Sequence, residues 1–150
     1  DSNRIRPMAI TSIEFAQFER ELRKTKKHHL DLLAPELGKA YVIAISRDGC
    51  PNCEEQKPKL DKLATMIKQK HGDKVVFTRV HVKYAKGLVE ESKRAKDVFR
   101  HYFYPTNIIV VRSKDRGAFE LYRNAGPEMA EPEKTIEMAV ETADMLAKED

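Results

Sequence analysis

Runs of apolar residues separated by polar, helix-forming stretches predict an α/β protein. A strand covered on both faces is apolar at nearly every position, whereas a surface helix is apolar at every third or fourth position. Strands are predicted over residues 8–10, 41–46, 75–82, 106–111 and 118–123. Helices are predicted over residues 11–33, 50–72 and 88–102, and from about residue 132 onward. This β-α-β-α-β-α-β-β-α order implies a mostly parallel sheet between helical layers, with a closing antiparallel hairpin.

Local signals place the ends of several of these helices. Thr11 and Glu14 match a capping box and predict that the first helix begins there. Pro132 suits the first turn of the last helix. Residues 1–7 are polar and expected to be flexible. The length, 150 residues, suits a single domain over residues 1–150.

The chain's two cysteines lie together where the strand 41–46 gives way to a helix, in the sequence Cys50-Pro51-Asn52-Cys53. Unpaired N–H groups and the helix dipole stabilise an anion at the first turn of a helix. Cys50 is therefore expected to form the thiolate more readily, and the thiolate is the nucleophile. Cys53, one turn further, can close a disulfide with it. Pro51 has a backbone angle suited to the first turn.

These residues resemble the active site of the thioredoxin superfamily. Pro58 stands where thioredoxins carry the proline that kinks the active-site helix, and Gly126 falls near a glycine late in their sheet. The segment Tyr104-Pro105-Thr106 matches the one that holds the family's cis-proline beside the dithiol. The resemblance covers nearly the whole chain and implies a thioredoxin-like fold, a mixed sheet with helices on both faces.

The resemblance implies a thiol–disulfide oxidoreductase that transfers electrons between its dithiol and protein substrates. Cys50 would attack a partner disulfide and Cys53 would resolve the mixed disulfide. A cis Pro105 would leave the backbone of Tyr104 free to bind an extended substrate strand beside Thr106. No cofactor is needed, because the electrons reside in the two sulfurs. The expected partners are proteins with disulfides or dithiols and an unidentified reductase or oxidase.

Two departures from thioredoxins bear on the dithiol. Gly49 replaces the usual aromatic residue before the first cysteine, and Ala44 replaces a buried acid six residues before it. Arg47 is expected to favour the thiolate, whereas three nearby acids oppose it, namely Asp48, Glu54 and Glu55. A Cys-Pro-x-Cys motif is more like that of glutaredoxins and oxidising catalysts. The direction of electron flow is left open.

Composition adds a few constraints on partners and location. The net charge is +4, but Lys and Arg are spread over every helix, which argues against a nucleic-acid interface. No apolar run approaches the ~20 residues that span a bilayer. We expect a monomer that binds neither membrane nor nucleic acid. Two cysteines confined to one motif favour a cytoplasmic protein, although a chain that starts at Asp1 is also compatible with an exported mature protein.

Two other functions are compatible with the sequence. Cys50 and Cys53 could supply half of a zinc site, although no second ligand pair supports it. The other ligands would come from the five histidines, His28, His29, His71, His81 and His101. Alternatively, the protein could be a binding module that keeps the fold and the cysteines but does no chemistry.

Overall fold

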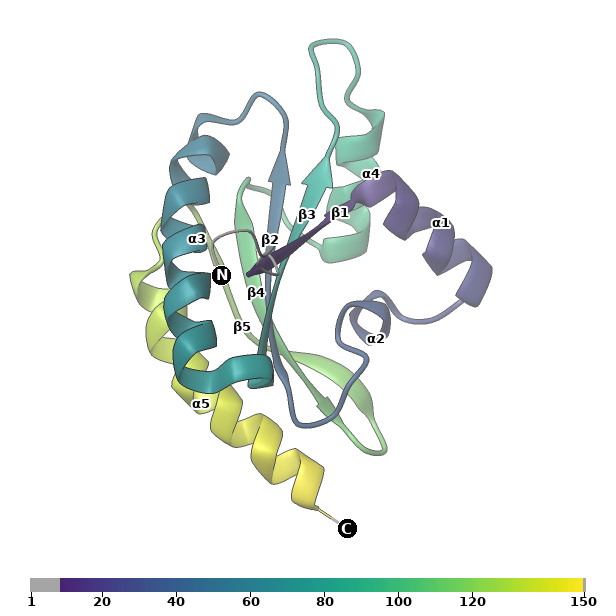
Figure 1. The fold of residues 1–150 in the computed structure, drawn as a ribbon. Coiled ribbons are helices and arrows are strands. Elements are labelled where there is room, and N and C mark those ends of the chain that lie inside the picture. The colour runs from purple at the N-terminus through teal and green to yellow at the C-terminus, as the bar shows by residue number, and fades with distance from the viewer. Residues whose placement is uncertain (1–8, 150) are drawn as a thin grey trace, which may run out of the picture.

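A five-stranded mixed sheet forms the centre of the protein, for which a computed structural model describes residues 9–149. The strand order is β1-β3-β2-β4-β5 (Figure 1). Strands β1, β3 and β2 are parallel, whereas β4 and β5 are antiparallel to their neighbours. The strands are β1 (Ile10–Glu14), β2 (Ala40–Arg47), β3 (Val75–Val82), β4 (Thr106–Ser113) and β5 (Gly117–Ala125). The predicted mixed sheet with a closing hairpin is confirmed.

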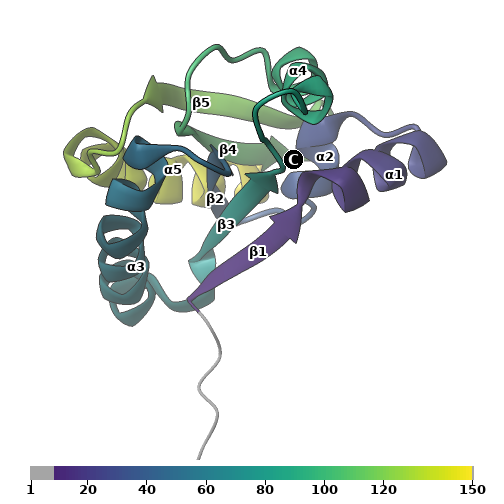
Figure 2. The same ribbon diagram turned by 90° about the horizontal axis from the view of Figure 1, so that it is seen from above.

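Helices cover both faces of this sheet, and each face has its own hydrophobic core (Figure 2). Helices α3 and α5 pack on one face, and α1, α2 and α4 pack on the other. The helices are α1 (Phe15–Thr25), α2 (His29–Leu33), α3 (Pro51–His71), α4 (Glu90–Phe99) and α5 (Ala130–Lys148), with a 3₁₀ turn, η1 (Gly72–Lys74), after α3. None of the helices within residues 9–149 is both long and apolar enough to cross a membrane.

The central strand β2 shows why its sequence is almost continuously apolar. Val42 and Ala44 belong to the core under α3 and α5, whereas Ile43 and Ile45 belong to the opposite core. Alternate residues of a strand point to opposite faces, so a strand between two helical layers is buried at every position. Full burial of a valine or isoleucine side chain contributes roughly 1.5–3 kcal/mol. This strand anchors the segment that follows it.

The first predicted helix is wrong at both ends. Thr11 and Glu14 do not form a capping box, because both lie in β1, which pairs in parallel with β3. Helix α1 begins at Phe15 and ends at Thr25, because the next residue, Lys26, adopts a left-handed conformation with φ 58°. A separate short helix, α2, carries the apolar positions near Leu33 and adds one helix to the predicted order. The predicted strand 8–10 overlaps β1 only at its end, and Met8 lies outside the described residues.

The later helices also differ in their bounds. Helix α4 is shorter than the predicted 88–102, because Arg100 takes a left-handed conformation and its N–H bonds to the carbonyl of Lys96. Tyr102, the last residue of the predicted helix, is 82% exposed in the loop that follows α4. Helix α5 begins at Ala130, a little before the predicted start at Pro132.

Candidate functional site

The dithiol lies in a strand–turn–helix junction at the carboxyl end of β2. The chain leaves the sheet after Arg47 and turns at Gly49, whose φ of 61° is strained for a residue with a side chain. Cys50 then caps the N-terminus of α3 in an extended conformation, and Pro51 occupies the first turn. Gly49, which departs from the family pattern, is therefore suited to the backbone of this turn.

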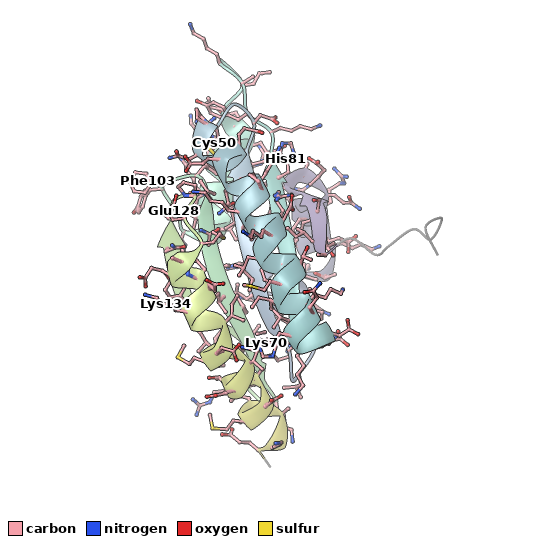
Figure 3. All side chains as sticks on the ribbon, turned by 60° about the vertical axis from the view of Figure 1, so that its left-hand side comes forward. Cys50, Lys70, His81, Phe103, Glu128 and Lys134 are labelled. Atoms are coloured by element: carbon pink, nitrogen blue, oxygen red, sulfur yellow. A yellow bond between two sulfur atoms is a disulfide. The ribbon has the colours of Figure 1, made fainter. Side chains whose placement is uncertain are left out.

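Cys50 and Cys53 form a disulfide with a Cα–Cα distance of 5.2 Å. The N–H of Cys53 donates a hydrogen bond to Cys50 Sγ at 3.2 Å. Both residues are buried, with 5% of Cys50 and 2% of Cys53 exposed. Cys50 therefore has its sulfur at the helix N-terminus, facing a backbone donor, and Cys53 lies within the helix. Figure 3 shows Cys50 at the opposite end of α3 from Lys70.

The segment around Pro105 lies directly beside the disulfide. The carbonyl oxygen of Tyr104 is 3.6 Å from Cys50 Sγ, and the Tyr104–Pro105 peptide bond is cis. Thr106 donates from its hydroxyl to the carbonyl of Phe103 at 2.6 Å, which holds the turn. The hydroxyl groups of Tyr104 and Ser92 are 3.0 Å apart, and burial raises the pKa of Tyr104. Two segments that are far apart in the sequence thus meet at one sulfur.

Arg47 is held by the turn that precedes the dithiol. Its guanidinium donates to the carbonyl of Asp48 at 2.7 Å and to that of Gly49 at 3.3 Å. The same group stacks over the ring of Tyr84, with Cζ 3.9 Å from the ring centroid. Such cation–π contacts contribute about 0.5–1 kcal/mol at exposed sites. Arg47 therefore braces the turn and brings a positive charge to this end of the molecule.

A histidine between two carboxylates secures the same turn, and sequence patterns gave no sign of it. His81 Nε2 is 2.6 Å from Asp48 Oδ1, and Nδ1 is 2.8 Å from Glu14 Oε2. Despite partial burial, these two carboxylates raise the pKa of His81, and His81 in turn lowers the pKa of Asp48. Below its raised pKa, His81 is an imidazolium and offsets the negative charge of Asp48, which was expected to oppose a thiolate. The β1–β3 register pairs Glu14 with His81, and the β2–β3 register, which pairs Arg47 with Val82, brings Asp48 beside them.

The remaining residues singled out from the sequence lie on or near α3. Asn52 and Pro58 are exposed, and Pro58 is inside the helix. Glu54 pairs with Lys57 at 3.1 Å, so its charge is partly offset at the surface. Ala44 is fully enclosed in the core between the sheet and α3.

The five histidines are distributed over four different parts of the fold. They lie around the short helix α2 (His28, His29), at the end of α3 (His71), on β3 (His81) and after α4 (His101). Within residues 9–149, no group of three or more histidine, cysteine or acidic side chains is arranged to hold a metal ion. The cysteines accordingly have no zinc-binding partners in the described part of the chain.

Similarity to known proteins is found by comparison of structures and not by comparison of sequences. No protein-family model and no curated protein sequence matches this chain. Among solved structures, a thioredoxin of Trichomonas vaginalis is 16% identical with a TM-score of 0.59, covering 88% of this chain and 98% of its own. The chain has a thioredoxin fold.

Two further structures with this fold show the same degree of likeness. The thioredoxin NaTrxh of Nicotiana alata is 18% identical with a TM-score of 0.58, covering 91% of this chain and 97% of its own. A chain from a complex of ferredoxin:thioredoxin reductase with thioredoxin f2 is 16% identical with a TM-score of 0.54, covering 87% of this chain and 94% of its own. In this chain the thioredoxin fold brings the Cys50–Cys53 pair and Pro105 to one end of the sheet.

Proposed function

We propose that the protein is a thiol–disulfide oxidoreductase that exchanges its Cys50–Cys53 pair with disulfides or dithiols of other proteins. The observation that carries the proposal is the position of Cys50, with its sulfur 3.2 Å from the N–H of Cys53 at the start of a 21-residue helix. A sulfur facing a backbone donor and the positive end of a helix dipole is stabilised as a thiolate. Arg47 adds positive charge to the preceding turn.

The reaction proceeds in two exchanges. The Cys50 thiolate attacks one sulfur of the partner disulfide, forms a Cys50–partner disulfide and expels the other partner sulfur, which takes up a proton. Cys53, after losing its proton, attacks the Cys50 sulfur, closes the Cys50–Cys53 disulfide and releases the second partner thiol. Two electrons pass from the protein to the partner, and the reverse sequence oxidises a partner dithiol. The roles of the two cysteines follow from Cys50 being at the helix start and Cys53 one turn inside.

The Tyr104-Pro105-Thr106 segment is proposed to hold the partner chain during the exchange. The Tyr104 carbonyl lies 3.6 Å from Cys50 Sγ, so a partner strand that contacts this backbone would carry its own sulfur to Cys50. Pro51 and Asn52 are exposed on the helix side of the same sulfur and complete the contact surface. In the cell, a reductase or oxidase would return the pair to its starting state. One structurally similar chain comes from a complex with ferredoxin:thioredoxin reductase, which is consistent with a reductase partner.

Insulin reduction tests this function. With dithiothreitol as the electron source, catalytic amounts of the protein are expected to accelerate precipitation of the insulin B chain well above the rate with dithiothreitol alone. Mass spectrometry after alkylation should find two alkyl groups on the reduced protein and none on the oxidised protein. Protein alkylated beforehand at both cysteines is the control and should give the uncatalysed rate. A binding module would accept the alkyl groups but leave the insulin rate unchanged, which would exclude the proposed function.

A further inference from the structure

A buried polar bridge connects the helix that carries Cys53 to the strand that follows Pro105. The side-chain amide of Gln56 donates from Nε2 to Asn107 Oδ1 at 2.7 Å. Gln56 lies one turn after Cys53 on α3, and Asn107 lies two residues after Pro105 on β4. Each of the two amide residues is only 1% exposed. The bridge therefore joins the two segments that meet at the Cys50 sulfur.

Asn107 extends the bridge to the end of β5. Its Nδ2 donates to Asn124 Oδ1 at 3.0 Å and to the carbonyl of Gly126 at 3.1 Å. The N–H of Gly126 in turn donates to the carbonyl of Pro105 at 2.8 Å. A closed loop of contacts thus runs from Pro105 along the chain to Asn107, across to Gly126 and back to Pro105. Gln56 connects this loop to α3.

The bridge lies within a largely apolar layer. Asn107 is the register partner of Ala44, which lies in the core under α3 together with Leu60 and Ile109. Replacing both members of a buried hydrogen-bonded pair by apolar groups of similar shape is often nearly neutral for stability, whereas removing one member costs about 1–3 kcal/mol. Packing alone therefore does not require two amides at this place. A directional bond does what apolar packing cannot, because it fixes one relative position of the two segments.

We propose that Gln56 and Asn107 are positioning residues that hold α3 in register with the Pro105 segment during exchange with protein partners. This rests on the proposed function, since it specifies how that site aligns a partner. The partner chain is held by the Tyr104–Thr106 backbone, and the Cys50 sulfur is held by α3. The bridge sets the distance and angle between them. A small alkylating reagent has to reach only the Cys50 sulfur, so the bridge does not affect the rate at which it alkylates Cys50.

The double variant Gln56→Met/Asn107→Leu tests the proposal, because both replacements are apolar and close in size to the originals. Insulin reduction is expected to fall roughly 10- to 100-fold, the range that misplacement of reacting groups by about 1 Å can cause. The rate at which iodoacetamide alkylates Cys50 should stay within about 2-fold. The melting temperature should fall only slightly, because the two buried amides are removed together and the Asn124 and Gly126 oxygens that lose a donor are only partly buried. Thr78→Val is the matched control, since Thr78 is a buried polar residue of β3 outside the bridge. It should leave both rates unchanged.

The other possible results distinguish a failure of the positioning role from a failure of the proposed function. A double variant that reduces insulin as fast as an active wild-type protein would overturn the positioning role and leave the proposed function intact. Equal losses of insulin reduction and alkylation would also overturn it, because they would place the effect on the thiol itself. A wild-type protein that fails to accelerate insulin reduction would remove the proposed function, and this inference with it. If the double variant does not fold, Gln56→Met alone must lower the ratio of the two rates, since Asn107 keeps its bonds to Asn124 and Gly126.

Discussion

Replacing Cys50 with serine is expected to abolish insulin reduction, lowering the rate by roughly a thousandfold or more, as on removal of an essential nucleophile. A serine hydroxyl at the start of α3 remains protonated and cannot attack a disulfide, whereas a thiolate is stabilised there by the N–H of Cys53. Cys53→Ser should keep the attacking sulfur but lose the second exchange. That variant is expected to stop as a mixed disulfide with its partner, detected by mass as a covalent adduct released by dithiothreitol.

The order of alkylation checks the assignment of the two cysteines independently. At mildly acidic pH, limiting iodoacetamide should label Cys50 before Cys53 in the reduced wild-type protein, as peptide mapping would show. Cys50→Ser should form no mixed disulfide under conditions in which Cys53→Ser does. Preferential labelling of Cys53, or adducts on Cys50→Ser alone, would reverse the two roles.

Acidification is expected to destabilise the protein through His101. This side chain is 4% exposed, and neither ring nitrogen has a hydrogen-bond partner among residues 9–149. Its ring packs edge-on against the ring of Tyr104, with the two ring centroids 4.7 Å apart. Burial, with smaller effects from Lys96 and Arg123, lowers the pKa of His101 from 6.5 to about 4. The folded protein therefore holds a neutral imidazole in a pH range where the unfolded chain holds a charged one.

The sign of the pH dependence follows from proton binding. Between pH 6.5 and pH 4 the unfolded chain binds the extra proton at position 101, so the free energy of unfolding falls as the pH falls. The contribution of His101 is present in full above pH 6.5, and its loss by pH 4 is about 3 kcal/mol. His101→Phe fits the same aromatic surroundings and has no proton to bind. Urea unfolding of both oxidised proteins at several pH values should show the smaller acid loss in the variant.

Acidification is also expected to lower the free energy of unfolding of both the wild-type protein and His101→Phe through His29, because burial lowers the pKa of His29 to about 4. The test is therefore the difference between the His101→Phe and wild-type curves rather than either curve alone. Parallel curves from pH 7 to pH 4 would show that His101 gains its proton in the folded state without cost. In that case the folded protein would not hold His101 as a neutral, unpaired imidazole against Tyr104.

The middle of the fold could be predicted from sequence because burial and pattern agree there. Residues 75–82 form β3 with the predicted bounds, and the continuous apolar run of β2 lies between two cores. The N-terminal region was mispredicted because local and long-range signals conflict. Thr11 and Glu14 form a local helix-start pattern, but pairing with β3 places them in a strand. The break at Lys26 is a left-handed turn at a residue type that gives no warning of one.

Part of the candidate site could be predicted from the sequence, and part could not. A short motif defines the Cys50–Cys53 pair, and its local geometry follows from its place at a strand-to-helix junction. The contacts that support it come from distant parts of the chain. Asp48 and His81 are 33 residues apart, and Gln56 and Asn107 are 51 apart. Such pairs depend on strand register and helix packing, so no local pattern could have predicted them.

Equilibration with glutathione tests the central claim most directly. The protein is incubated at a series of reduced-to-oxidised glutathione ratios, quenched with acid and alkylated. Its mass is then measured by mass spectrometry. If Cys50 and Cys53 form a redox dithiol, the number of alkyl groups on the protein should rise from zero to two in a single two-electron transition as the glutathione becomes more reducing. The positive charge of Arg47 and the N–H of Cys53 favour the reduced thiolate, so we expect a midpoint of roughly −190 to −240 mV, above the value of about −270 mV for thioredoxin. Two alkylatable thiols that persist at the most oxidising ratio would contradict a redox role for Cys50 and Cys53.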